Sequence, residues 1–206
     1  MWFDYFQRGG PIMWPLLVCS VIALAVVLER VWFLIRERAE RHPQEVEQFF
    51  TLAEGGHWEE AARPAGKAGY ILRTLRAALT HPQESASQAL LRASSAELRR
   101  YNRGLSLLDT IITLSPLLGL LGTVTGMIRA FGFVKGELDA PAAITGGIAE
   151  ALIATAFGLA VAIIALIPFN YLNTRLEEAR HDLQDACTRL EMLLQANPSS
   201  EETWRN

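Results

Sequence analysis

Two threonines in apolar surroundings, Thr123 and Thr155, raise the first chemical question about this sequence. Each lies in a long hydrophobic stretch. Two such stretches that cross a membrane in opposite directions would hold both hydroxyls at a similar depth. Hydroxyls at one depth are able to line a polar passage. They are equally able to donate to the carbonyl four residues earlier in their own helix, so both interpretations stay open here.

Charged residues near the ends of the same stretches are the next candidates. Glu150 lies near the start of the stretch that holds Thr155, and Asp109 near the start of the one that holds Thr123. An acid inside a membrane is costly and is therefore a functional candidate, although a position near the interface also allows plain hydration. Glu150 is the better candidate for a polar route. Arg129 is placed either to pair with it or to extend towards the interface.

The middle of both stretches holds threonines and glycines but no acidic residue. A chain that carried protons by itself would need a titratable group at that depth. If protons move, we therefore expect their carrier to come from another subunit.

Small residues recur along one face of each stretch, at spacings of three and four. They are Ser115, Gly119, Gly122 and Gly126 in the first, and Ala151, Thr155, Gly158, Ala162 and Ala165 in the second. Small side chains permit the close packing by which membrane helices associate. These faces predict contact with protein instead of lipid, either between two helices of one chain or around a pore. Pro116 adds a polar group here, because it cannot donate to the Ile112 carbonyl.

Three apolar blocks position these residues, and each is long enough to cross ~30 Å of hydrocarbon at ~1.5 Å per residue. We expect transmembrane helices over residues 12–35, 105–133 and 146–172. A signal peptide is the alternative for the first block. It is disfavoured because Arg8 is the one basic residue before the block, and "VVLERVWF" is no small-residue cleavage site.

Lysine and arginine predict the orientation of these helices. Residues 36–104 hold eleven of them, whereas the N-terminus (1–11) and the connection 134–145 hold one each. Basic residues are enriched on the cytoplasmic side. We therefore expect 36–104 and the tail, 173–206, in the cytoplasm, with the N-terminus and the connection in the periplasm.

The insert and the tail are helical by pattern. "YILRTLRAAL" and "QALLRASSAELRRYNRGL" are amphipathic. In the tail, apolar residues form one stripe along a helix: Leu176, Ala179, Leu183, Cys187, Leu190 and Leu194. That stripe fits either packing on the chain's own insert or a contact between subunits. The expected fold is an all-α membrane protein whose three transmembrane helices extend into a cytoplasmic helical bundle.

The composition argues against several function classes. A net charge of −3 gives no reason to expect nucleic-acid binding. Cys19 and Cys187 are expected as free thiols, and no zinc-ligand spacing occurs, so neither a metal nor a cofactor is expected. His57, Glu59 and Glu60 come closest to a catalytic group, but "HWEEAARPAG" fits an ordinary helix start. We expect no enzyme.

The apolar blocks resemble the MotA/TolQ/ExbB proton-channel family. "SPLLGLLGTVTGMIRAF" (115–131) and "GGIAEALIATAFGLAVAIIALIPFNYL" (146–172) match its second and third helices, and "LLVCSVIALAVVLERVWFL" (16–34) is similar to its first. The ExbB branch is the most similar and TolQ the next. The flagellar MotA branch has four spans, which disfavours it.

The resemblance implies an inner-membrane motor. Family members form a pentamer whose second and third helices line a pore. Two copies of a single-pass ExbD/TolR-type partner sit in that pore, each with a protonatable aspartate. Proton entry is thought to drive rotation, which energises TonB-dependent transport or, in TolQ members, Tol–Pal envelope maintenance through a TolA-type transducer. By motif position, Thr123 and Thr155 resemble the pore-lining threonines, and Glu150 the acid of "GIAEAL".

Two alternatives accompany the ExbB-type expectation. One is the TolQ-type subunit. The other is a non-conducting oligomeric scaffold in the lipid bilayer, whose glycines serve packing alone.

Overall fold

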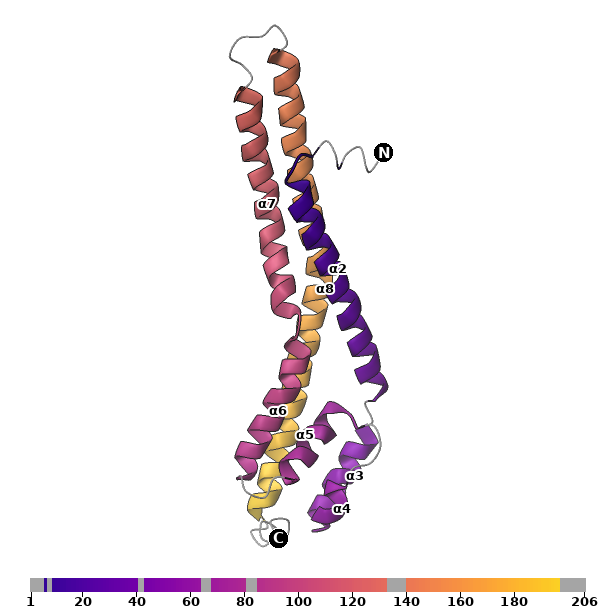
Figure 1. Cartoon of the computed structure of the whole chain (residues 1–206). Coiled ribbons are helices and arrows are strands. Elements are labelled where there is room, and N and C mark those ends of the chain that lie inside the picture. The colour runs from indigo at the N-terminus through magenta and orange to yellow at the C-terminus, as the bar shows by residue number, and fades with distance from the viewer. Residues whose placement is uncertain are drawn as a thin grey trace. The chain divides into compact units, whose positions relative to one another are not determined.

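The computed structural model describes Phe6 and residues 9–40, 43–63, 68–80, 85–132 and 140–196, with residues 140–143 as backbone alone. Every regular element among them is an α-helix. The helices are α2 (Met13–Ala39), α3 (Pro43–Glu54), α4 (Trp58–Ala62), α5 (Tyr70–Leu79), α6 (Ala86–Asn102), α7 (Leu105–Gly132) and α8 (Ala140–Ala196), as labelled in Figure 1.

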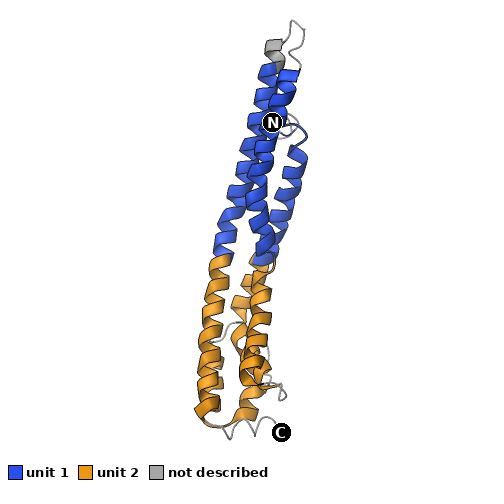
Figure 2. Ribbon diagram, turned by 90° about the vertical axis from the view of Figure 1, so that its left-hand side faces the viewer, with its two compact units in different colours: residues 1–30, 104–172 blue, residues 31–103, 173–206 orange. Residues whose placement is uncertain are grey.

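The chain forms two compact units, coloured in Figure 2. Unit 1 consists of residues 1–30 and 104–172, and unit 2 of residues 31–103 and 173–206. Helices α2 and α8 contribute residues to both units. Unit 1 holds the candidate site, and unit 2 holds the helical insert and the tail.

Three helical segments are long and apolar enough to cross a membrane; they lie within Met13–Ala39, Ala86–Gly132 and Ile144–Ala196. The expected all-α fold with three such helices is therefore confirmed. Helix α8 begins at Ala140, before residue 146 where the third span is expected, and it continues to Ala196. The third span and the tail are thus one helix. Residues 134–139, half of the expected connection, lie outside the described residues.

Some apolar side chains of helix α2 are buried against the rest of the protein, and others are exposed on its surface. Leu16 and Ala23 are buried in unit 1, whereas Trp14 and Trp32 are exposed near the two ends of the helix. The two tryptophans are 18 residues apart along α2, or ~27 Å in a helix. Tryptophans are enriched at both membrane–water interfaces, so this spacing suits a helix that crosses the bilayer.

Local signals explain where the shorter helices begin and end. Helix α3 starts at Pro43, whose missing N–H has no cost in a first turn. It is followed by Gly56 at φ +78°. Helix α6 is capped by the Ser85 hydroxyl, which accepts from the Gln88 N–H at 3.4 Å. Gly104, at φ +80°, separates α6 from α7. A Cβ there would lie 2.9 Å from Val26 Cγ1, so both backbone conformation and space favour glycine.

The core of unit 2 joins the insert to the tail. Phe49, Leu75 and Leu90, from α3, α5 and α6, pack in one cluster with Leu190 and Leu194 of α8. A smaller cluster joins Tyr70 to Ala179 and Leu183. The leucine stripe of the tail is therefore used by the chain's own insert, which was one of the two interpretations left open.

A charged cluster lies beside that core, centred on Arg73 of α5. Its guanidinium donates to Glu37 at 2.8 Å and to both carboxylate oxygens of Glu97 at 3.1 and 3.0 Å. Both glutamates are buried. Burial works to lower the pKa of Arg73, but its bonds to Glu97 and Glu37 outweigh burial, and the pKa ends above the usual arginine value. The cluster joins α2, α5 and α6.

Candidate functional site

The contact between α7 and α8 in unit 1 is built from the predicted small residues. A Cβ added to Gly158 would lie 2.5 Å from the Ser115 carbonyl oxygen, and one added to Gly119 would lie 3.0 Å from Thr155 Cα. A Cβ at Gly122 would lie 2.5 Å from Ala154 Cβ. Real Cβ atoms do not approach so closely, so the two backbones lie as near as glycine allows.

The remaining members of the two small faces follow the same pattern. Gly126 lies against Ala151, and a Cβ added to Gly126 would be 3.0 Å from Ala151 Cβ. Ala162 and Ala165 are buried. The faces therefore pack within one chain, as one of the two expected arrangements requires.

The two threonines have different hydrogen bonds. Thr155 donates across the contact to the Gly119 carbonyl at 2.9 Å, whereas Thr123 donates within α7 to the Leu120 carbonyl at 2.7 Å. In an α-helix the Gly119 carbonyl accepts from the N–H of residue 123. Thr155 thus bonds to the helical turn that Thr123 completes, and the two residues lie at one level of the helix pair. Both side chains are partly exposed.

Ser115 is the polar residue buried most completely at this contact. Its side chain is 0% exposed, and its hydroxyl has no hydrogen-bond partner among the described residues. A buried polar group without a partner costs about 1–3 kcal/mol. The hydroxyl therefore opposes stability at the point where α7 and α8 are closest.

Replacing Ser115 with alanine should stabilise the protein. Because the substitution removes the unpaired hydroxyl and no packed carbon, we expect unfolding to require about 1 kcal/mol more. The thermal midpoint of the detergent-purified chain should rise by about 2–4 °C. Ser106→Ala, at an exposed position of the same helix, is the control and should leave the midpoint unchanged. A fall in the Ser115→Ala midpoint would mean that the hydroxyl has a partner.

Glu150 and Arg129 form an ion pair in unit 1. Arg129 Nη1 lies 3.0 Å from Glu150 Oε1, with side-chain exposures of 43% and 24%. Gly10, at φ +73°, packs on the same carboxylate, because a Cβ there would lie 1.9 Å from Oε1. Arg129 was expected either to pair with Glu150 or to extend towards the interface, and in the structure it pairs with Glu150. Asp109 is exposed and lies apart from this group, near the start of α7.

Sequence reasoning did not single out Gly10, Gly147 or Ala154. Gly10 is required by its left-handed conformation and by the carboxylate beside it. A Cβ at Gly147 would lie 2.6 Å from Ala130 Cβ, so Gly147 extends the close contact by one turn. The glycine pair before the first block was the available signal for Gly10, and Gly147 precedes Ala151 by the same spacing of four.

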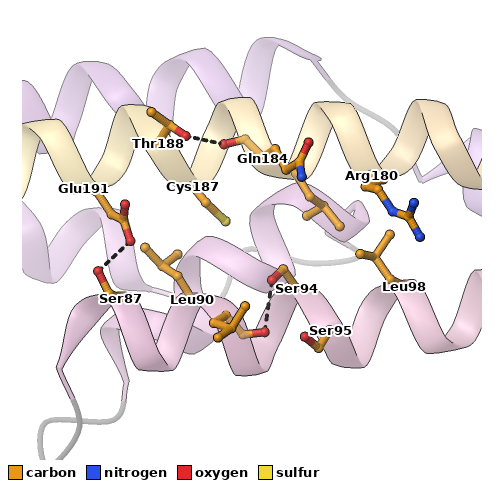
Figure 3. A pocket seen from close by; sticks show the side chains of 12 residues that line it. Ser87, Leu90, Ser94, Ser95, Leu98, Arg180, Gln184, Cys187, Thr188 and Glu191 are labelled. Carbon is orange, nitrogen blue, oxygen red and sulfur yellow. Dashed lines mark hydrogen bonds between the residues drawn. The ribbon is translucent and has the colours of Figure 1, made fainter.

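Unit 2 holds a separate groove between α6 and α8, shown in Figure 3. It has a volume of about 290 Å³, and Leu90, Ser94 and Leu98 line it from α6, opposite Gln184 and Cys187 of α8. Burial, and then the nearby charge of Glu191, raise the pKa of the Cys187 thiol to about 11. The thiol is therefore protonated at neutral pH.

Cys187 should react slowly with alkylating reagents until the pH is strongly alkaline. The thiolate is the reactive form. With a pKa of about 11, the folded chain should react at pH 8 about 100-fold more slowly than the unfolded chain. The rate should keep rising up to about pH 11. Iodoacetamide labelling read by mass spectrometry, in a Cys19→Ala background, measures this rate. Equal rates in the folded and unfolded chains would contradict the prediction.

Metal ligands do not gather in the described part of the chain: no three His, Cys, Asp or Glu side chains there are placed to hold one ion. His57, Glu59 and Glu60 lie at the start of α4, where Glu59 and Glu60 occupy the first turn.

Comparison with known proteins identifies the family. Residues 65–185, more than half of the chain, match the MotA/TolQ/ExbB proton channel family. The chain belongs to this family. The match covers α5, α6 and α7, and α8 as far as residue 185, so it includes the contact of Thr155 with Gly119 and the pair of Arg129 with Glu150.

Several relatives within the family are similar over most of their length. The ExbB-like 1 protein of Synechocystis sp. is 39% identical over 178 residues, which cover 82% of this chain and 69% of the relative. The ExbB-like 3 protein of the same organism is 38% identical, covering 78% and 80%. The biopolymer transport protein ExbB of Neisseria meningitidis serogroup B is 30% identical, covering 86% and 90%.

Proposed function

We propose that this chain is the channel subunit of an ExbB–ExbD-type motor in the bacterial inner membrane. In this proposal five copies surround a pore that holds a single-pass partner of the ExbD/TolR type. The partner carries the protonatable aspartate, and the proton motive force energises TonB-dependent outer-membrane transport. The chain has no catalytic role of its own.

The observation that carries the proposal is the bond of the Thr155 hydroxyl to the Gly119 carbonyl. The bond fixes the Thr155 hydroxyl at the level of Thr123. Neither helix carries an acidic residue near that level. Each hydroxyl keeps acceptor capacity after donating one bond. Two partly exposed hydroxyls at one level are able to accept a hydrogen bond from a partner's protonated carboxyl group. The acid missing from this chain is then supplied by the partner.

Membrane placement and orientation belong to the same proposal. The N-terminus (1–11) and the connection 134–145 face the periplasm, and residues 36–104 and 173–206 lie in the cytoplasm, because basic residues are concentrated in 36–104. The names of the relatives support a role in biopolymer transport.

Proton flux into liposomes tests the proposal. The chain and its single-pass partner are reconstituted together with a pH-sensitive dye inside the vesicles. Thr123→Val with Thr155→Val should lower the flux by about tenfold or more, since two hydrogen bonds of about 1 kcal/mol each are lost. Thr125→Val is the matched control, because Thr125 also donates within its own helix, to Leu121 and Gly122, but lies about 200° around α7 from Thr123. Thr155→Ser keeps the hydroxyl and should retain most of the flux.

Wild-type vesicles that take up no protons would contradict the proposal, and so would a double variant with wild-type flux. The first result would favour the second candidate, a non-conducting scaffold. One observation supports that candidate: the small faces of α7 and α8 are used within one chain. A TolQ-type role would give the same flux and differs only in the transducer that responds.

A further inference from the structure

Helix α7 carries a polar face near its start, at the end expected in the cytoplasmic half of the membrane. Its members, all exposed, are Ser106, Asp109, Thr110 and Thr113. At about 100° per residue, these side chains lie within an arc of about 100° around the helix axis. The face reaches Thr113, ~12 Å beyond the expected start of the span at residue 105. Lipid tails offer polar groups no hydrogen bonds, so we expect this face to meet protein or water.

The polar face points away from the contact with α8. Gly119, Gly122 and Gly126, which pack on α8, lie about 160° around α7 from the middle of the polar face. Thr123 lies only about 40° around the helix from Asp109. It is 14 residues further along α7, or ~21 Å. The polar face therefore continues the side of α7 that holds Thr123 towards the expected cytoplasmic end.

The Asp109 carboxylate has no ion pair or hydrogen bond within the described part of the chain. The helix dipole does not account for this acid, because it stabilises acids in the first turn, and α7 has none there. The neighbouring hydroxyls donate within α7, Thr110 to the Ser106 carbonyl at 2.9 Å and Thr113 to the Asp109 carbonyl at 3.1 Å. Their remaining capacity is to accept. The face thus presents acceptors and one negative charge, which suit a cation.

We propose that this face binds the basic residues at the cytoplasmic end of the single-pass partner's span. Lysine and arginine are enriched at that end of a membrane helix. In the proposed pore, five copies of Asp109 surround the partner, and their like charges repel each other unless cations lie between them. Carboxylates bind ammonium and guanidinium groups through charge-assisted hydrogen bonds. The inference rests on the proposed function, since it names what holds the partner at the inner end of the same pore.

Retention of the partner tests this role of Asp109. The chain is co-expressed with a single-span protein of the ExbD/TolR type and extracted in detergent, and bound partner copies are counted by native mass spectrometry. Asp109→Asn should lower the fraction of complexes that keep both copies about tenfold, and raising the salt from about 0.1 M to about 1 M should lower the wild-type fraction too. Asp109→Glu keeps the charge and should keep the partner. Asp185→Asn, which removes an exposed acid from α8, is the matched control and should behave as wild type.

Carbodiimide cross-linking locates the contact. A water-soluble carbodiimide joins a carboxylate to a nearby lysine amine as an amide. The partner used here carries lysine at each basic position beside the cytoplasmic end of its span. We expect a cross-linked peptide that joins Asp109 to one of these lysines. Asp109→Asn should abolish this product, and a partner whose lysines lie only at the other end of its span should not form it.

The outcomes separate this inference from the proposed function. If wild type holds two partner copies and Asp109→Asn holds them equally well, as plain hydration of this acid would give, the role of Asp109 is overturned and the proposed function stands. The role is also overturned if Asp109→Glu loses the partner as Asp109→Asn does, or if no cross-linked product includes Asp109. Wild type that recruits no partner would contradict the proposed function itself.

Discussion

Gly158→Ala should separate α7 from α8 and lower the stability of unit 1. The new Cβ would lie 2.5 Å from the Ser115 carbonyl oxygen and 3.1 Å from Gly119 Cα. Both are backbone atoms, so no side chain is able to turn aside. Overpacking of this kind costs about 1–3 kcal/mol. The thermal midpoint of the purified chain should fall by roughly 2–12 °C, and the bond of Thr155 to Gly119 should weaken with it.

Gly146→Ala is the matched control on the same helix. A Cβ at Gly146 meets no atom within 4 Å. Its alanine variant should therefore keep the wild-type midpoint or exceed it, since alanine favours a helix more than glycine does. Equal thermal midpoints for Gly158→Ala and Gly146→Ala would show that Gly158 is not needed for the close approach of α7 and α8.

Arg73→Met should be the most destabilising single substitution in unit 2. It leaves the buried Glu37 carboxylate without a guanidinium, and Glu97 with Arg100 as its remaining arginine partner. Removing one member of a buried charged group costs about 3–5 kcal/mol. We expect most of the variant to be unfolded or aggregated in unit 2, measured by the loss of helical circular dichroism on heating and by protease cleavage within residues 43–103.

Arg99→Met is the control for Arg73, because it removes an exposed arginine from α6. It should change the midpoint little. The double variant Arg73→Met, Glu37→Gln removes the carboxylate that loses its arginine, while Glu97 keeps Arg100, and it should recover part of the loss. A single Arg73→Met variant as stable as Arg99→Met would show that the cluster does not hold α2, α5 and α6 together.

The small faces illustrate what could be predicted from the sequence. A spacing of three and four places Gly119, Gly122 and Gly126 on one side of a helix whatever that helix packs against. Their burial was therefore predictable. The helix that packs on these glycines was not predictable, because a helix of the same chain and a helix of another copy would both require small residues there. The leucine stripe of α8 was ambiguous for the same reason.

Contacts that depend on the register between helices were harder to predict. Thr155 has an acceptor within its own helix, and its choice of Gly119 depends on how far α8 is shifted along α7. The cluster at Arg73 joins residues 37, 73 and 97, which are distant in the sequence and carry no motif. Gly10 precedes its helix and faces Glu150 only because of the turn that it makes.

The native mass of the detergent-extracted chain tests the central claim most directly. The chain is expressed first alone and then with a single-span protein of the ExbD/TolR type, and each complex is weighed by native mass spectrometry. We expect five chains of 22.8 kDa each, which gain two copies of the partner. A monomer or dimer that recruits no partner would contradict that claim, because such a complex encloses no pore at Thr123 and Thr155.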